Sequence, residues 1–265
     1  MRHVATTVGL LLALSASGAQ AARELTTDRP DATESPFTVE AGRVQLEASL
    51  FEFAQDTYNS DHASVRISEW NFAPFNLRIG LTPDIDLHVI LETHRMSRID
   101  DRDAGRVSKL SGTGDVTLRA KYNFWGNDGG DTALGIMPFV KLPTGKSGLG
   151  NHSVEGGVIL PVALELGAGW GLGAMTEVDF VRNDANTGYT YVWLNSASFS
   201  HDIAGALGGF LEVVSEVGNG PASLSFNSGL TYGINDDLQL DLGTNVGISR
   251  SAEDLLVFAG GSKRW

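Results

Sequence analysis

The stretch DVTLRAKYNFW, residues 115–125, decides the fold, because its apolar and polar residues alternate one by one. Successive side chains of a β-strand point to opposite faces. Val116, Leu118 and Tyr122 would therefore share one face, and Arg119 and Lys121 the other. The pattern predicts a strand with one apolar face and one charged face.

The same alternation recurs from residue 42 to the end of the chain, whereas helical periodicity is weak throughout. The expected strands are 42–54, 66–81, 84–93, 114–125, 132–142, 153–164, 169–182, 189–200, 206–216, 223–233, 237–248 and 254–265. In the strand over 189–200, Asn195 shares a face with Trp193 and Phe199, so the pattern leaves its apolar side open.

Strand length and loop length favour a membrane barrel over a soluble sandwich. Sandwich strands have about 5 to 6 residues, whereas the expected strands have about 10 to 12, the length of a tilted bilayer crossing. Short connections alternate with generally longer ones, such as 94–113, so the short turns gather at one end. We therefore expect an all-β protein, a closed antiparallel transmembrane β-barrel of about twelve strands with no unpaired edge in lipid.

One segment permits a second interpretation, because residues 156–175 are almost wholly apolar and long enough for a membrane helix. Six glycines and Pro161 disfavour a helix there. Two strands that turn near Glu165 fit the segment better.

The N-terminus predicts an exported protein. Residues 1–21 contain one charge, an apolar run and the ending Ala19-Gln20-Ala21, which is typical of a cleaved signal peptide; an uncleaved anchor is the alternative. We expect residues 22–41 to form a periplasmic N-terminal segment and residues 42–265 to form the barrel. The predicted location is the outer membrane of a Gram-negative bacterium.

Composition excludes several functions. The 265 residues include no cysteine, so disulfides, thiolate metal sites and thiol nucleophiles are excluded. A formal net charge of −13 makes binding to nucleic acid unfavourable. The partners we expect are outer-membrane lipid and lipopolysaccharide, a small-molecule solute and the barrel-assembly machinery.

The polar faces of the strands predict the residues that line the lumen. If the apolar faces contact lipid, the side chains of opposite parity point inward. They are Arg43, Glu47, Arg78, Asp86, His88, Glu92, Arg119, Lys121, Lys141, Glu155, Glu177, Asp179, Glu212, Glu216 and Asp241. Opposed charges would select solutes in a constricted channel, or they would pair off and seal a narrow barrel.

An Asp28-Arg29-Pro30-Asp31 motif precedes the first strand. Arg29 could pair with Asp28, Asp31 or acids of the lumen and hold the N-terminus as a small plug. A solvated linker is the alternative. At about 20 residues this segment is too short for an energised plug domain, so any transport should be passive.

The sequence resembles a proteobacterial family labelled as transporters of the phenol meta-degradation pathway. The resemblance rests on residues 27–36 (TDRPDATESP), 42–47 (GRVQLE), 77–82 (LRIGLT), 112–115 (GTGD) and 141–145 (KLPTG), in that order. The chain ends in Arg264-Trp265 where the family commonly ends in Arg-Phe. The resemblance implies an outer-membrane barrel with a transport role.

Motifs for other chemistry are weak. The adjacent pair His152-Ser153 could serve as the base and nucleophile of a lipid-modifying enzyme. Neighbouring residues on a strand point to opposite faces, however, so a direct relay between them is geometrically poor. The acidic run at 100–103 lacks the ligand spacing of a calcium loop. We expect no metal, no cofactor and no enzyme activity.

We therefore predict a passive channel for small solutes, with hydrophobic or aromatic compounds among the candidates. A lipid-modifying barrel enzyme and a structural barrel are the alternatives.

Overall fold

The computed structural model describes residues 23–265 except 58–63, 184 and 186. The described residues form fifteen β-strands: β1 Val44–Asp56, β2 Val65–Phe72, β3 Phe75–Thr82, β4 Ile85–Leu91, β5 His94–Asp101, β6 Arg106–Gly112, β7 Val116–Trp125, β8 Thr132–Leu142, β9 Glu155–Gly167, β10 Trp170–Arg182, β11 Tyr189–Ala204, β12 Leu207–Val217, β13 Ser223–Asn235, β14 Leu238–Gly247 and β15 Leu255–Arg264. The expected signal peptide, residues 1–21, lies outside the described residues.

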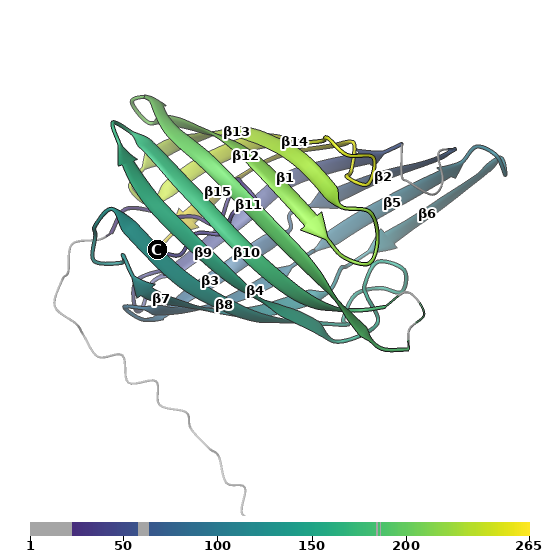
Figure 1. The fold of residues 1–265 in the computed structure, drawn as a ribbon, viewed down its shortest axis with the longest axis horizontal. Coiled ribbons are helices and arrows are strands. Elements are labelled where there is room, and N and C mark those ends of the chain that lie inside the picture. Colours follow the sequence, from purple (N-terminus) through teal and green to yellow (C-terminus); the bar gives the residue numbers. More distant parts are fainter. Residues whose placement is uncertain (1–22, 58–63, 184, 186) are drawn as a thin grey trace, which may run out of the picture.

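Twelve of these strands close into an antiparallel barrel (Figure 1). Hydrogen bonds join β1, β3, β4 and β7 in that order, and β7 is followed by β8 to β15 in sequence order. Closure comes from β15, which pairs with β1 from Gln45↔Arg264 to Gln55↔Leu255. The wall therefore has no free edge around this ring, as a sheet in hydrocarbon requires.

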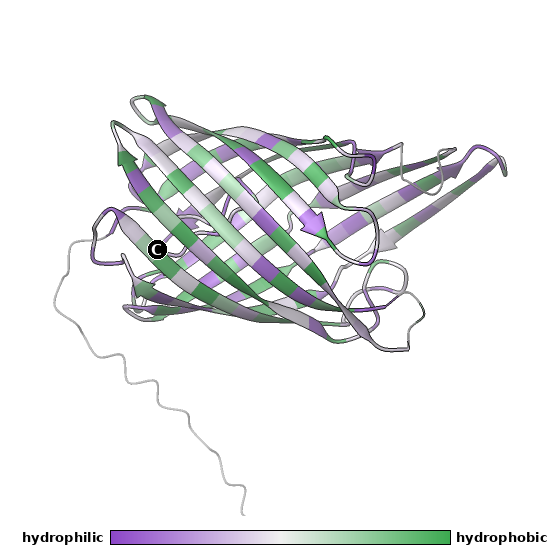
Figure 2. Cartoon of the chain, in the orientation of Figure 1, coloured by the Kyte–Doolittle hydropathy of each residue, from purple (hydrophilic) through white to green (hydrophobic). Residues whose placement is uncertain are grey.

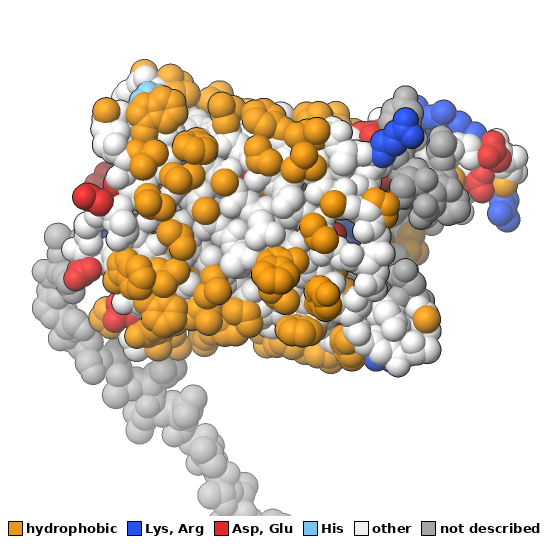
Figure 3. Space-filling model, viewed as in Figure 1, with side chains coloured by type: hydrophobic (Ala, Val, Ile, Leu, Met, Phe, Trp, Pro, Cys, Tyr) orange, Lys and Arg blue, Asp and Glu red, His pale blue; other side chains and the backbone are white. Residues whose placement is uncertain are grey.

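Hydrophobic and hydrophilic residues alternate along the strands of the wall (Figure 2), and the exposure of their side chains separates them onto two faces. On β7, Leu118 and Phe124 are exposed on the outer surface, whereas Lys121 and Asn123 are buried inside. In the view of Figure 3, apolar side chains cover much of the barrel wall and charged side chains gather at its ends. An apolar belt outside and a polar interior are the arrangement of a barrel that crosses a lipid bilayer.

The ends of the barrel differ in their connections. One end carries the turns between β3 and β4, β7 and β8, β9 and β10, β11 and β12, and β13 and β14, with the start of β1 and the end of β15. We call it the short-turn end. The opposite, long-loop end carries longer segments such as 143–154 and 248–254.

The expected loop over 94–113 is wrong, because most of it forms β5 and β6. β5 pairs with β2 and β6 pairs with β5, so that β2, β5 and β6 continue the wall beyond the barrel as a three-stranded extension at the long-loop end (Figure 1). An extension beyond the apolar belt need not bury one face, so its residues need not alternate in polarity. Likewise, the expected strand 66–81 is divided into β2 and β3 at Ala73 and Pro74.

Two ambiguous segments are resolved. Residues 156–175 belong to the hairpin of β9 and β10. On β11, Tyr191, Trp193 and Phe199 are exposed on the outer face, whereas Ser196 and Ser198 are buried inside. The described residues contain no helix long and apolar enough to cross a membrane.

Candidate functional site: the barrel interior

Residues 23–43, which we call the N-terminal segment, run through the barrel interior before β1 begins. The segment starts at the short-turn end, where Arg23 donates to Pro83 O at 2.9 Å. It reaches inward as far as residues 29–34, returns, and leaves beside Gly80, whose N–H donates to Arg43 O at 3.0 Å. A Cβ on Gly80 would lie 2.0 Å from Glu40 O, so only glycine permits this close approach.

Arg78 is the centre of a buried charge cluster on the β1–β3–β4 wall. Its guanidinium contacts Glu47 at 2.8 Å, Asp86 at 3.0 Å and Asp28 of the N-terminal segment at 3.3 Å. Lys121 adds a second cation, 2.6 Å from Asp28 Oδ1. The cluster binds the segment to the wall through Asp28, which both cations contact.

The cluster also fixes the returning half of the segment. Asp86 accepts the Val39 N–H at 2.9 Å and lies 2.9 Å from His88 Nε2. Arg78 donates to Phe37 O at 2.8 Å. The segment thus forms hydrogen bonds with polar side chains of the wall, which would otherwise lack partners in a narrow interior.

Arg29 extends to the neighbouring part of the wall formed by β1, β14 and β15. Its guanidinium donates to Asp241 Oδ1 at 2.7 Å and to Ser49 Oγ at 2.6 Å. It also lies 5.5 Å from the centre of the Phe258 ring, within the range of a cation–π contact.

Glu212 holds the innermost part of the segment. Its carboxylate accepts the backbone N–H groups of Ala32 at 3.0 Å and Thr33 at 2.7 Å. Asn227 donates to the same carboxylate at 2.7 Å, and the Thr33 hydroxyl lies 2.6 Å from Ser196 Oγ. Hydrogen bonds from β11 and β12 therefore converge on residues 32–33, and Asn227 of β13 supports the Glu212 carboxylate.

Beyond Thr33 the segment faces a wall that is largely apolar. Glu34 pairs with Arg119, and the Arg119 guanidinium lies 5.7 Å from the Phe139 ring centre. Met137, Ile159 and Met175 form a buried apolar cluster with Phe139 packed against it. Apolar side chains therefore line part of an otherwise polar interior.

Burial and neighbouring charges shift the pKa values of three carboxyls of the segment. Burial disfavours the charged form of Asp28, but Arg78 and Lys121 outweigh it and hold the pKa well below its usual range. Burial and the nearby Glu212 raise the pKa of Asp31 to about 7. Burial also raises the pKa of Glu34, although Arg119 opposes the shift.

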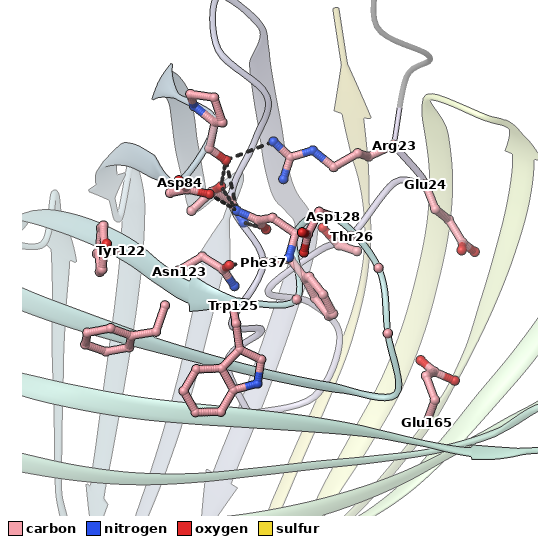
Figure 4. Close-up of a pocket in the computed structure, with 17 residues that line it drawn as sticks. Arg23, Glu24, Thr26, Phe37, Asp84, Tyr122, Asn123, Trp125, Asp128 and Glu165 are labelled. Carbon is pink, nitrogen blue, oxygen red and sulfur yellow. Dashed lines mark hydrogen bonds between the residues drawn. The ribbon is translucent and has the colours of Figure 1, made fainter.

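Two cavities open at the short-turn end on either side of Arg23 and Glu24. One, of about 830 Å³, extends to Phe37, Asn123 and Glu165 (Figure 4). The other, of about 530 Å³, extends to Asn235 and Gln239. The N-terminal segment therefore divides this mouth of the barrel.

The structure brings most residues of the expected lumen set into the interior. The buried members are Glu47, Arg78, Asp86, His88, Lys121, Glu155, Glu212 and Asp241, and the side chain of Arg119 is 10% exposed. Glu177, Asp179 and Lys141 are partly buried nearer the long-loop end. Three lie at the rims: Arg43 contacts Asp237 at 3.3 Å, Glu92 contacts Arg95 at 3.5 Å, and Glu216 is exposed.

Sequence reasoning missed several interior residues. Gln45 and Asn227 are buried and bonded to carboxylates of the wall. Arg264 is buried at the short-turn end, where it contacts Asp237 at 2.8 Å and Glu40 at 3.2 Å. The alternation places all three positions on the inward face. Gln45 and Asn227 are uncharged, however, and Arg264 is the penultimate residue, so the sequence gives little reason to select them.

His152 and Ser153 do not form a catalytic arrangement. His152 lies in the segment before β9, and its Nε2 accepts the Gly148 N–H at 3.2 Å. That nitrogen is therefore engaged with the backbone instead of with a serine hydroxyl.

The sequence matches the family described as "Putative MetA-pathway of phenol degradation" over residues 27–265. Among curated proteins, none matches the chain.

Solved structures with a similar fold include the COG4313 outer membrane channel from Pseudomonas putida F1, at 13% identity and a TM-score of 0.65, covering 91% of this chain and 100% of that one. The β domain of the Bordetella autotransporter BrkA is 14% identical with a TM-score of 0.52, covering 85% and 100%. The NanC porin is 8% identical with a TM-score of 0.51, covering 82% and 98%. At such identities the similarity establishes the fold, which channels and an autotransporter share.

Proposed function

Because this chain belongs to the family described as the MetA-pathway of phenol degradation, we propose that it is a passive outer-membrane channel for small solutes, with apolar or aromatic compounds as the favoured class. The observation that carries the proposal is the interior itself. A closed barrel with an apolar outer belt encloses charged residues, an apolar wall and a chain segment that divides its mouth.

The ends of the barrel support an orientation. Outer-membrane barrels have short periplasmic turns and longer extracellular loops. The short-turn end, with the N-terminal segment and the end of β15, would face the periplasm. The β2–β5–β6 extension would then stand on the extracellular side.

The composition of the interior supports the solute class. Met137, Ile159 and Met175 present apolar surface inside the barrel, and Phe139 continues it. Ligand sites for uncharged organic molecules are mostly apolar with a few polar groups that fix orientation. The description of the family refers to phenol degradation, which agrees with a small aromatic solute.

The N-terminal segment would limit the flux. Its contacts with Arg78, Asp241 and Glu212 fix it across the interior at three places around the wall. A solute that enters from the long-loop end must therefore wait for part of the segment to move. The short length of the segment is consistent with passive movement down a gradient.

The test is single-channel conductance of the folded full-length protein in a planar bilayer, with phenol or arabinose added as probe. We expect a small ionic conductance that phenol reduces and arabinose leaves unchanged. Met137→Gln keeps the size of the side chain but removes apolar surface, so it should weaken the block by phenol. The variant also serves as the control, because any effect of phenol on the bilayer itself would be the same for both proteins. A folded protein without conductance would overturn the channel, and an equal block in the variant would overturn the solute class.

A further inference from the structure

The outer face of the β2–β5–β6 extension continues the outer face of the barrel. Residues directly opposite in an antiparallel ladder share a face. Phe51 pairs with Phe72 and Phe53 pairs with Trp70, and the two ring pairs lie 5.7 Å and 5.5 Å apart. These aromatic side chains mark the upper edge of the apolar belt, where a membrane interface is expected.

A row of cations follows this edge directly. Trp70 is opposite Met96, and two residues further from the barrel the opposed residues are Ser68, Arg98 and Lys109. Two residues along a strand correspond to about 7 Å. The charged ends of Arg98 and Lys109 therefore lie at the depth of the lipid headgroups.

Arg98 and Lys109 are placed directly opposite each other on neighbouring strands. Like charges in this relationship are unfavourable unless an anion lies between or beside them. Among the described residues Arg98 is paired with Asp100 at 3.6 Å, and Asp100 is itself opposite a third cation, Arg66. Among the described residues Lys109 has no carboxylate partner, so positive charge remains in excess on this face of an acidic protein.

The inner face of the same strands shows the opposite arrangement. There Arg95 is paired with Glu69 at 2.7 Å and with Glu92 at 3.5 Å. Arg95 of the inner face thus has two carboxylate partners, whereas on the outer face three cations share Asp100.

A shallow groove joins the cations to the apolar edge. It has a volume of about 310 Å³. Its lining residues are Trp70, Met96, Ser97, Arg98, Lys109, Leu110 and Ser111. An apolar floor beside two cations is complementary to a lipid whose phosphate lies immediately above its acyl chains.

We propose that Arg98 and Lys109 bind a phosphate group of a lipid in the outer leaflet, with the adjoining lipid chain against Trp70 and Met96. On the extracellular side of an outer membrane the source of this phosphate is lipopolysaccharide. The site lies on the outer surface and is independent of whether the interior conducts.

The experiment titrates the detergent-solubilised full-length protein with bisphosphorylated lipid A and counts bound lipid by native mass spectrometry. Removing one surface cation near a lipid phosphate weakens binding about fivefold. We expect this loss for Arg98→Gln and for Lys109→Gln, and about 25-fold for the double variant. Arg106→Gln is the matched control, because Arg106 is exposed on β6 but opposite Asp101 on the other face.

Dephosphorylated lipid A should bind to the wild type as weakly as lipid A binds to the double variant. Inorganic phosphate at equal concentration should not displace lipid A. The proposal is overturned if the two lipids bind equally, if free phosphate displaces lipid A, or if Arg106→Gln loses as much affinity as Lys109→Gln. Circular dichroism of each variant establishes that the barrel is folded.

Discussion

Arg29 and Asp241 are 212 residues apart in the sequence, and their side chains meet inside the barrel at 2.7 Å. Asp241 is fully buried on β14, whereas Arg29 belongs to a segment with no regular secondary structure. Ser49 of β1 also accepts from Arg29 at 2.6 Å. The N-terminal segment and the C-terminal strands are thereby joined by an ion pair inside the lumen, as well as by the pairing of β1 with β15.

Replacing Arg29 should loosen the N-terminal segment. A hydrogen bond to a charged group contributes about 2 kcal/mol, which shifts an equilibrium about 30-fold. We expect Arg29→Ala to raise the time-averaged conductance. Asp241→Asn should do the same, and the double variant should add little beyond either change. Additive effects would show that the two residues act separately.

Removing Arg78 should destabilise the whole barrel. Asp28, Glu47 and Asp86 would remain buried without their shared cation. The loss of one partner of a buried ion pair costs about 3–5 kcal/mol. Urea unfolding of Arg78→Met in lipid vesicles measures this cost. The control is Arg43→Met, because this rim arginine is more exposed and should cost less than about 1 kcal/mol.

The position of the N-terminal segment should depend on pH through Asp31. The pKa of Asp31 is raised to about 7 by burial and by Glu212, so the folded segment favours the protonated carboxyl. Its stabilising contribution is therefore complete below about pH 4 and is lost as the pH rises through about 7. We expect conductance to increase between pH 5 and pH 8, and Asp31→Asn to flatten this dependence. An unchanged slope in the variant would assign the effect to another group.

Gly80→Ala should disturb the point where the segment leaves the interior. The new Cβ would lie 2.0 Å from the backbone oxygen of Glu40, which cannot move without displacing the segment. Overpacking of this kind costs about 1–3 kcal/mol. Gly220→Ala is the control, because no atom lies within 4 Å of the Cβ position there. Equal unfolding midpoints for the two variants would contradict the close approach.

The barrel could be predicted from the sequence because lipid enforces its pattern. On strands such as β7 and β14, each outward position faces hydrocarbon and each inward position faces polar groups, so the alternation is visible residue by residue. Strands β5 and β6 do not show this pattern because they extend beyond the apolar belt of the barrel. There the pattern carries no signal, as the exposure of both Ile99 and Arg98 illustrates.

The contacts of the N-terminal segment could be anticipated only in outline. The sequence predicts that Arg29 lies near acids of the lumen, but six strands (β1, β4, β9, β10, β12 and β14) supply such acids at inward positions. Which acid pairs with Arg29 depends on how far the segment enters and where it turns back. The backbone N–H groups of Ala32 and Thr33 donate to Glu212 and fix that depth. Every residue except proline has a backbone N–H, so the sequence does not indicate which residues a carboxylate will bind in this way.

Flux through a barrel whose segment is covalently fixed tests the central claim most directly. Thr33 Oγ1 and Ser196 Oγ lie 2.6 Å apart, and the chain has no cysteine, so Thr33→Cys with Ser196→Cys offers one disulfide. The account predicts that liposomes containing the reduced variant take up solute and that oxidation largely stops the uptake. Complete disulfide formation with unchanged uptake would contradict it.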